Sequence, residues 1–291
     1  ILKHSDTKVF AIDRDKLTQK FANNLKTKFP QRFYFSQNKF SNLEKIIQKD
    51  LKPKAIIFDL GLSSYQLADH KRGFSFKSSG PLNMQMGFNK YSAYDVVNTL
   101  DKKSLINIIR ILGEEKEAKK IANNIVKYRE KKPISNSDEL SNIISNAKKN
   151  KNYKKNPATK TFQAIRIFVN QELTELVLAL TAATKLLSNG GILLVVTFHS
   201  IEDKIVKYFF SLYSNLRKKP SRYLPITENK TDMFSVVSKK PIQPNKEEID
   251  NNLRSRSAKL RYAVRNNNIF SYPEEFEKKF ENYTKMEGSR I

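Results

Sequence analysis

Residues 8–35, KVFAIDRDKLTQKFANNLKTKFPQRFYF, decide the fold class of this chain. Residues 8–12 form an apolar run typical of a short buried strand, which ends at Asp13. Residues 15–28 repeat hydrophobic side chains every four positions, which predicts a helix, and residues 33–35 predict a second strand. Alternating strands and helices of this kind predict a parallel sheet in an α/β fold.

The same alternation continues downstream. Ser41 is the predicted N-cap of a helix that ends at Gln48, and residues 55–58 predict the next strand, which ends at Asp59. Ligands of parallel α/β sheets bind beyond the carboxyl ends of the strands, so Asp13 and Asp59 are candidate ligand-binding residues. Asp13 has the position of an acid that binds ribose hydroxyl groups; a solvated strand-end aspartate is the alternative.

The middle of the chain has only helical signals. Apolar spacing predicts helices near 105–112, 118–128 and 137–147, and residues 148–155 contain five lysines without an acid between them. We therefore expect a small helical insertion within residues 91–156 that ends in a basic loop.

The α/β pattern then returns. A single long helix is predicted over 162–187 and is expected to end at Gly190–Gly191. Residues 192–198 predict a central buried strand, and Ser200 is the predicted cap of the next helix, with Asp203 at its third position.

The last quarter of the chain has weaker signals. Residues 215–231 predict a basic irregular loop, and segments 234–238 and 260–264 are expected to pair at one edge of the sheet. The tail after Asn266 is polar and aromatic, and little regular structure is expected there.

Composition narrows the class of partner. The 291 residues include 54 Lys and Arg against 29 Asp and Glu, a net charge of +25, which indicates a polyanion such as nucleic acid; an A/T-rich coding bias is the alternative. Because Cys is absent and only three His occur, we expect no disulfide, no thiolate nucleophile and no metal centre. The longest apolar run, 192–196, is far short of the roughly 20 residues of a membrane span, and no signal peptide opens the chain, so a cytoplasmic protein is expected.

Several long motifs occur in one order along the chain, and together they resemble the bacterial small-subunit rRNA cytosine-N4 methyltransferases, the RsmH/MraW family. The resemblance covers almost the full length, from AIDRD to RSRSAKLR. Its motifs are FDLGLSSYQL (58–67), RGFSF (72–76), GPLNMQM (80–86), GEEKEAKKIANNIV (113–126), PATKTFQAIRIFVNQEL (157–173), GGILLVVTFHSIEDKIVK (190–207) and RSRSAKLR (254–261).

The resemblance implies a class I, Rossmann-like methyltransferase domain that uses S-adenosylmethionine and carries an inserted helical domain. The implied parts are the first methyltransferase segment (1–90), the insertion (91–156), the second methyltransferase segment (157–265) and a C-terminal tail (266–291). The implied reaction is N4-methylation of a cytidine in the decoding region, at the P site, of 16S rRNA in the small ribosomal subunit. Monomer and dimer are both left open.

The resemblance also assigns cofactor contacts. Asp13 would hold the ribose, Phe40 would pack near the adenine, and Asp59 and Gln66 would line the rest of the site. The family's glycine-rich segment around the methionine moiety is expected upstream of Ile1, because the first glycine of this chain is Gly61.

Two residues are candidates for catalysis. The exocyclic N4 of cytosine is a poor nucleophile, so the enzyme must align it with the methyl group and accept hydrogen bonds from it. Asn83 is the first candidate for that contact, although the family usually has Asp at this position. His199 is the second; a packed strand-end histidine is the alternative. No cysteine intermediate is needed for amine methylation.

The remaining candidates concern RNA. Phe74 and Phe76 would stack on a flipped base, or would simply belong to the core. Arg72 precedes them in the same motif. A basic cluster without acids would contact phosphates, or would be a solvated strand; its members are Arg254, Arg256, Lys259 and Arg261.

Three functions are compatible with these motifs and with the composition. An rRNA methyltransferase is the first. A non-catalytic rRNA-binding or assembly factor is the second, because Asn83 replaces the usual carboxylate. A small-molecule methyltransferase is the third, and the basic surplus argues against it.

Overall fold

A computed structural model describes residues 1–3, 7–48, 50–76, 79–148, 156–214 and 232–288. The chain contacts divide it into two compact units. Unit 1 contains residues 1–13, 24–61 and 175–281, and unit 2 contains residues 14–23, 62–174 and 282–291. Each unit is described separately below.

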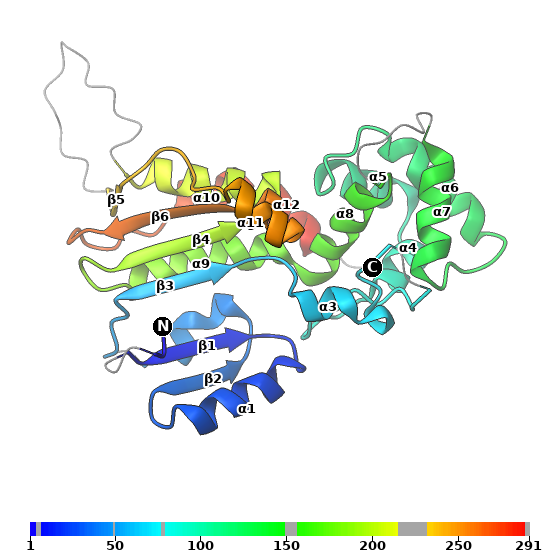
Figure 1. The fold of residues 1–291 in the computed structure, drawn as a ribbon. Helices are drawn as coiled ribbons and strands as arrows, with labels where there is room; N and C mark the ends of the chain where they lie inside the picture. Colours follow the sequence, from blue (N-terminus) through cyan, green and yellow to red (C-terminus); the bar gives the residue numbers. More distant parts are fainter. Residues whose placement is uncertain (4–6, 49, 77–78, 149–155, 215–231, 289–291) are drawn as a thin grey trace, which may run out of the picture. The chain divides into compact units, whose positions relative to one another are not determined.

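The described strands all belong to unit 1. One parallel pair joins β1 (Val9–Asp13) to β2 (Phe33–Gln37). The other sheet has the order β3-β4-β6-β5, with β3 parallel to β4 and the remaining neighbours antiparallel; its strands are β3 (Ala55–Asp59), β4 (Ile192–Thr197), β6 (Lys259–Arg265) and β5 (Phe234–Val236). The predicted α/β class, strand segments and late edge pair are confirmed. Figure 1 shows β1, β3 and β4 pointing the same way, so Asp13 and Asp59 both end their strands on that side.

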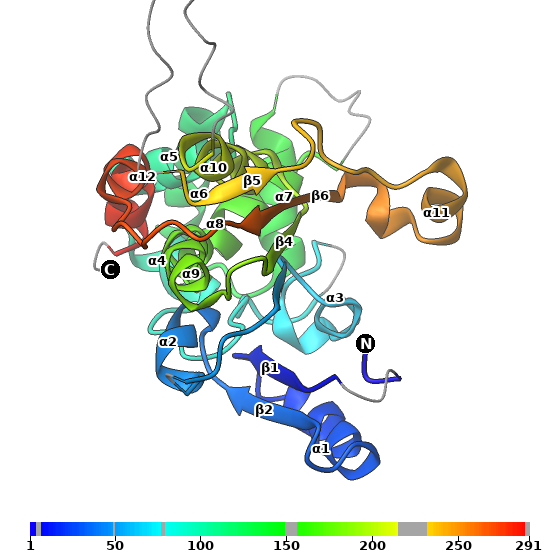
Figure 2. The ribbon, with the colours of Figure 1, turned by 90° about the vertical axis from the view of Figure 1, so that its left-hand side faces the viewer.

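Helices cover the four-stranded sheet. Figure 2 shows α9 (Glu172–Leu186) and α10 (Ser200–Leu212) together on one face of it. Phe209 of α10 packs against Phe234 of β5 and Phe276 of α12 (Glu274–Glu287), with ring centroids 5.9 and 4.9 Å apart.

The prediction of little structure after Asn266 is wrong, since α12 occupies most of that tail. Phe276 and Phe280 are at most 1% exposed, which explains why a segment with many charged residues becomes helical. Tertiary packing of two phenylalanines outweighs the polar composition there.

Unit 2 is helical. Its capped helices include α4, α5 and α7, whose N-caps are Ser92, Asp101 and Asn136. Among the described residues, the α-helices that lie wholly within unit 2 are α3 (Ser64–Ala68), α4 (Ala93–Thr99), α5 (Lys102–Ile111), α6 (Ala118–Arg129), α7 (Ser137–Ala147) and α8 (Thr159–Asn170). The predicted insertion, 91–156, falls inside this larger unit, and residues 149–155 of its basic loop lie outside the described residues.

The other helices are α1 (Thr18–Lys28), α2 (Leu43–Ile46) and α11 (Lys246–Asn251). Ser41 lies inside a 3₁₀ turn (Phe40–Asn42), and Asn42 precedes α2 without a side-chain capping bond, so the predicted Ser41 cap is wrong. The turn tightens the chain before the short helix begins. The predicted loop 215–231 lies outside the described residues.

The predicted single helix over 162–187 is wrong. Gln171 adopts the left-handed conformation (φ 52°, ψ 41°) and separates α8 from α9. The break occurs in the polar run Asn170–Glu172, where Asn170 is fully buried and bonds a neighbouring loop instead of solvent. Apolar periodicity continues across the break, so the sequence pattern does not reveal it.

The buried carboxylate of Glu287 caps the start of α9. It accepts hydrogen bonds from the Leu173 and Thr174 amides, at 3.1 and 2.7 Å, and from the Thr174 hydroxyl. Burial raises the pKa of Glu287 to about 8 from its ordinary 4.5, and the hydrogen bonds from Thr174 and Leu173 oppose this rise. The last turn of α12 therefore fixes the first turn of α9.

We predict that Glu287 makes stability fall as pH rises from about 4.5 to about 8. In that window the folded state holds a proton that the unfolded state has released, so the free energy of unfolding decreases with pH. Urea denaturation of wild-type protein and Glu287→Gln at several pH values measures this. The difference between the two should fall with pH, and a constant difference would contradict the prediction.

Candidate functional site

The carboxyl ends of β1 and β3 carry the two predicted acids. Asp13 is half-buried and its backbone carbonyl accepts the Asn38 amide at 3.0 Å. The Asp59 side chain is open to solvent, yet partial desolvation and then the nearby Glu202 carboxylate raise its pKa. Phe40 packs on Phe58 of β3, with ring centroids 5.6 Å apart.

These residues fit an adenosine group. Carboxylates at strand ends accept hydrogen bonds from ribose hydroxyls, and an aromatic side chain offers a surface for a base. Asp13, Asp59 and Phe40 all belong to unit 1, and their roles in cofactor binding stay predictions.

Gln66 has a different environment, in unit 2. Its oxygen accepts the Ser63 amide at 2.8 Å, which completes the capping box of α3, and its amide donates to Asp15 at 2.6 Å. Both ends of the Gln66 side chain are therefore used inside the protein. It positions Asp15, a residue for which the sequence predicted no role.

Asp15 is the centre of a buried polar network. It is 3% exposed and forms an ion pair with Arg72 as well as the bond from Gln66. Arg72 also donates to the Gln85 carbonyl at 2.7 Å, and its guanidinium lies over the Phe74 ring. We call Asp15, Gln66 and Arg72 the Asp15 network.

The network borders a cavity of about 320 Å³. Its lining includes Asn83, the predicted catalytic residue, and the exposed ring of Phe88. A volume of this size falls within the range of pockets that hold small ligands. The full lining is Asp15, Lys16, Arg72, Asn83, Gln85, Met86, Gly87, Phe88 and Asn89.

The orientation of the Asn83 amide is fixed by the backbone. Its Oδ1 accepts the Gln85 amide at 2.8 Å, so the oxygen and nitrogen ends are defined. The Oδ1 atom has a second lone pair, and Nδ2 is a donor. Asn83 therefore offers one acceptor and one donor at fixed relative positions.

Asn170 holds the loop that carries this lining. It is fully buried, accepts the Met86 amide at 2.9 Å and donates to the Met84 carbonyl at 2.8 Å. Arg14 bonds the Asn170 and Gly87 carbonyls, both at 2.7 Å. Neither residue was predicted from the sequence; for Asn170 the available signal was a polar side chain within the apolar periodicity of α8.

Gly87 shows how closely this loop approaches Arg14. Its φ is +136°, and a Cβ atom there would lie 2.2 Å from the Arg14 carbonyl oxygen. Only glycine fits that backbone contact.

The predicted stacking residues are largely packed. Phe74 is 6% exposed, which favours the core alternative, and Phe76 is half-buried with an edge-to-face contact to Phe162 at 6.1 Å. Arg72, predicted to bind RNA, instead uses its guanidinium within the Asp15 network.

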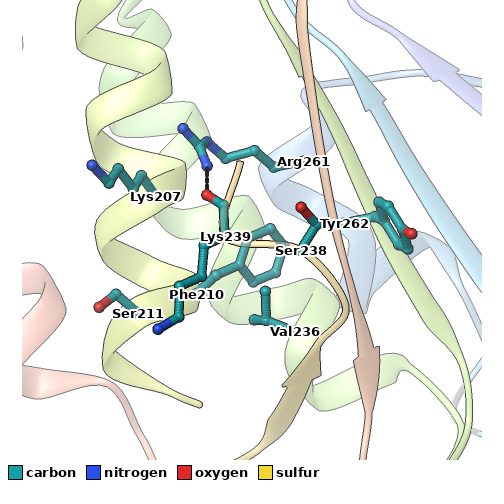
Figure 3. A pocket seen from close by; sticks show the side chains of 8 residues that line it. All are labelled: Lys207, Phe210, Ser211, Val236, Ser238, Lys239, Arg261 and Tyr262. Atoms are coloured by element: carbon teal, nitrogen blue, oxygen red, sulfur yellow. Dashed lines mark hydrogen bonds between the residues drawn. The ribbon is translucent and has the colours of Figure 1, made fainter. Parts of the chain in front are cut away.

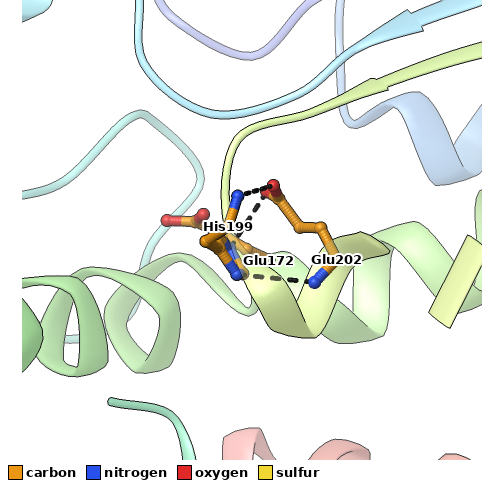
Figure 4. Close-up of side chains that lie close together, drawn as sticks. All are labelled: Glu172, His199 and Glu202. Atoms are coloured by element: carbon orange, nitrogen blue, oxygen red, sulfur yellow. Dashed lines mark hydrogen bonds and ion pairs between the residues drawn. The ribbon is translucent and has the colours of Figure 1, made fainter. Parts of the chain in front are cut away.

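His199 is the N-cap of α10, which corrects the predicted Ser200 cap. Its Nδ1 accepts the Glu202 amide at 3.4 Å, while the Glu202 carboxylate accepts the Phe198 and His199 amides. Glu202 occupies the third helical position in place of the predicted Asp203. Figure 4 shows this pair, in which the His199 Nε2 atom lies 3.1 Å from a Glu202 oxygen. The His199 side chain is 8% exposed, which agrees with the alternative of a packed histidine at the end of a strand.

The predicted basic cluster divides into two parts. Arg254 and Arg256 are exposed on a 3₁₀ turn (Leu253–Ser257), whereas Lys259 and Arg261 of β6 share the Asp203 carboxylate at 3.0 and 2.7 Å. Burial alone would raise the pKa of Asp203, but these two hydrogen-bonded cations outweigh it and lower that pKa.

The fold and the strand-end acids define an α/β protein of the class that binds a nucleotide cofactor. A sequence profile of the MraW methylase family matches residues 1–266. The chain belongs to this family, so it is a methyltransferase, and S-adenosylmethionine is the methyl donor of the family.

Individual relatives agree with this assignment. A protein of Xanthobacter autotrophicus named ribosomal RNA small subunit methyltransferase H is 44% identical over 271 residues, which cover 92% of this chain and 78% of the relative. Proteins of the same name from Ehrlichia canis and a Wolbachia species are 44% and 43% identical and are covered over 88% and 87% of their lengths.

Among the described residues, no helix combines the length and apolar character that crossing a bilayer requires.

We predict that Asn170→Ala destabilises the protein by about 2 kcal/mol or more, because the buried Met84 carbonyl and Met86 amide lose their partner. The loosened loop should also reduce methyl transfer per folded molecule. Asn98→Ala is the matched control, since Asn98 bonds the Tyr94 and Ile134 backbone but does not line the cavity. Urea denaturation and initial rates measure both effects; equal rate losses in the two variants would contradict a role in the cavity.

We also predict that Glu202→Gln lowers the pKa of Asp59, because it removes the neighbouring negative charge. The amide oxygen can still accept the capping bonds at the start of α10. Carbon-13 NMR titration of the Asp59 carboxyl group measures the change. Asp101, whose pKa is lowered by its bonds to Ser104, is the internal reference and should not move.

Proposed function

We propose that this protein transfers a methyl group from S-adenosylmethionine to small-subunit ribosomal RNA. Membership of the MraW methylase family and relatives named ribosomal RNA small subunit methyltransferase H support the proposal. The structural observation that supports it most directly is the position of Asn83, whose fixed amide lines a nucleoside-sized cavity. The finer proposal is N4-methylation of a cytidine in the decoding region, at the P site, of 16S rRNA in the cytoplasm, by a class I domain with an inserted helical domain.

When bound, S-adenosylmethionine supplies an electrophilic methyl group. Asp13 would hold its ribose hydroxyls and Phe40 would pack near its adenine, as the residues at the ends of β1 and after β2 allow. The Asp15 network and Asn170 would keep the cavity in shape through their bonds within the protein. Their contribution is preorganisation.

Asn83 is the catalytic residue of this proposal. The lone pair on N4 is delocalised into the cytosine ring, so a hydrogen bond accepted from N4 increases electron density on the nitrogen as the new bond forms. Oδ1 of Asn83 accepts that bond, and the proton leaves after methyl transfer. A carboxylate base is therefore not obligatory, and the replacement of the family's usual Asp by Asn83 is compatible with activity.

Cytosine must leave its stack to reach this residue. The cavity of about 320 Å³ suits one base, and the exposed Phe88 ring on its lining is available for stacking. Phe88 takes the place that the sequence assigned to Phe74.

The test incubates the protein with small ribosomal subunits that lack the modification and with methyl-labelled S-adenosylmethionine. We expect label on N4-methylcytidine in the digested 16S rRNA, and label on a ring carbon would contradict the proposal. Asn83→Ala should lower the rate about tenfold, the value of one hydrogen bond, whereas Asn83→Asp should retain most of it. Asn123→Ala, on the exposed face of α6, is the control. Binding of subunits without any methyl transfer would instead support an assembly factor.

A further inference from the structure

A second pocket, of about 140 Å³, lies in unit 1 between α10, β6 and the segment after β5 (Figure 3). Three cationic side chains line it: Lys207 of α10, Lys239 after β5 and Arg261 of β6. Phe210 and Val236 supply the apolar part of its lining, and Ser211 adds a hydroxyl group. Lys207 and Arg261 end two of the family motifs, whereas Lys239, Phe210 and Val236 lie outside them. The cavity at Asn83 does not include any of these residues.

Arg261 is held in a fixed position. Its side chain is 10% exposed, its Nε donates to Asp203 at 2.7 Å and its Nη1 donates to the Lys239 carbonyl at 3.1 Å. Figure 3 shows the second of these bonds. Within the described residues Nη2 has no protein acceptor, so two N–H donors of a rigid guanidinium are available for a ligand.

Lys207 and Lys239 have no acidic partner among the described residues, and both are exposed. The nearby carboxylate, Asp203, is already shared by Lys259 and Arg261. The pocket therefore has an excess of positive charge that the protein does not neutralise. An anion bound there would be attracted by all three cations.

The size of the pocket restricts the anion. About 140 Å³ is less than half of the roughly 300 Å³ at which pockets begin to enclose small molecules, so a whole nucleotide does not fit. One phosphate group does, and a rigid guanidinium with flanking ammonium groups is a typical phosphate site.

We propose that this pocket binds one backbone phosphate of the RNA substrate and so orients the RNA on unit 1. The proposal rests on the proposed function for the identity of the RNA. RNA is favoured over a free anion because the exposed Lys204 and Lys240 extend the positive surface beyond the pocket, as a polymer of phosphates requires. Arg261 is the rigid contact, and Lys207 and Lys239 close around the phosphate.

Binding of unmodified small ribosomal subunits, without S-adenosylmethionine, is measured against KCl concentration for wild-type protein and Lys207→Gln/Lys239→Gln. We expect weaker binding and a salt slope reduced by about 1, as for one lost phosphate contact. Lys119→Gln, an exposed lysine of α6 outside the pocket, should leave the slope unchanged. Equal slope changes in the double variant and the control would overturn the proposal. Because no methyl transfer is measured, failure of the proposed reaction would not affect this result.

A calorimetric titration with inorganic phosphate distinguishes the source of the anion. Heat that disappears in the double variant, together with unchanged subunit binding, would overturn the assignment to RNA. At saturating subunits, the double variant should keep the wild-type kcat while its KM rises, because neither lysine belongs to the cavity at Asn83. A loss of kcat with an unchanged KM would contradict a binding role.

Discussion

The buried carboxylate of Asp15 is the interaction on which the cavity of unit 2 depends. A carboxylate that is 3% exposed requires a cation and hydrogen-bond donors, and Arg72 and Gln66 supply them. Breaking such a pair by removing one partner typically costs about 3–5 kcal/mol, because the remaining charge stays buried. Gln66 belongs to α3, and Arg72 also donates to the Gln85 carbonyl. The Asp15 network therefore fixes both α3 and the loop that carries Asn83.

The same need for partners explains why several predicted ligand contacts form bonds within the protein, and their roles toward a ligand stay predictions. Gln66, Arg72 and His199 are polar residues in highly specific motifs, which makes each a reasonable candidate for binding. In the structure the Gln66 and Arg72 side chains bond neighbouring protein groups. His199 uses Nδ1 to cap α10, while its buried Nε2 makes no hydrogen bond within the described residues. The residue types in these motifs are therefore required to fold a polar cavity as much as to contact a ligand. Asn83, Asp13 and Asp59 stay predicted ligand contacts.

Local pattern was a good guide wherever one strand or helix buries a continuous apolar face. The strands at 9–13, 55–59 and 192–197 and the helices α5, α6 and α7 follow directly from periodicity. Periodicity did not predict the positions at which a single polar side chain ends or begins a helix. The break at Gln171 follows Asn170, whose hydrogen bonds reach the distant Met84 and Met86, and the spacing does not reveal these partners. The His199 cap uses Glu202 three residues on, but histidine is not among the usual N-cap residues. The helix at the C-terminal end depends on where Phe276 and Phe280 pack.

The sequence by itself determined the α/β class, the basic character, the family and the acids at the strand ends, because these follow from composition, periodicity and motif order. The tertiary structure alone decided which polar groups have capacity left for a ligand. It brought Arg14 and Asn170 onto the Asn83 loop, and Lys207 and Lys239 beside a fixed Arg261. The physical reason is that a hydrogen-bond donor or cation is available only if no protein partner reaches it, and such partners come from segments far apart in the chain.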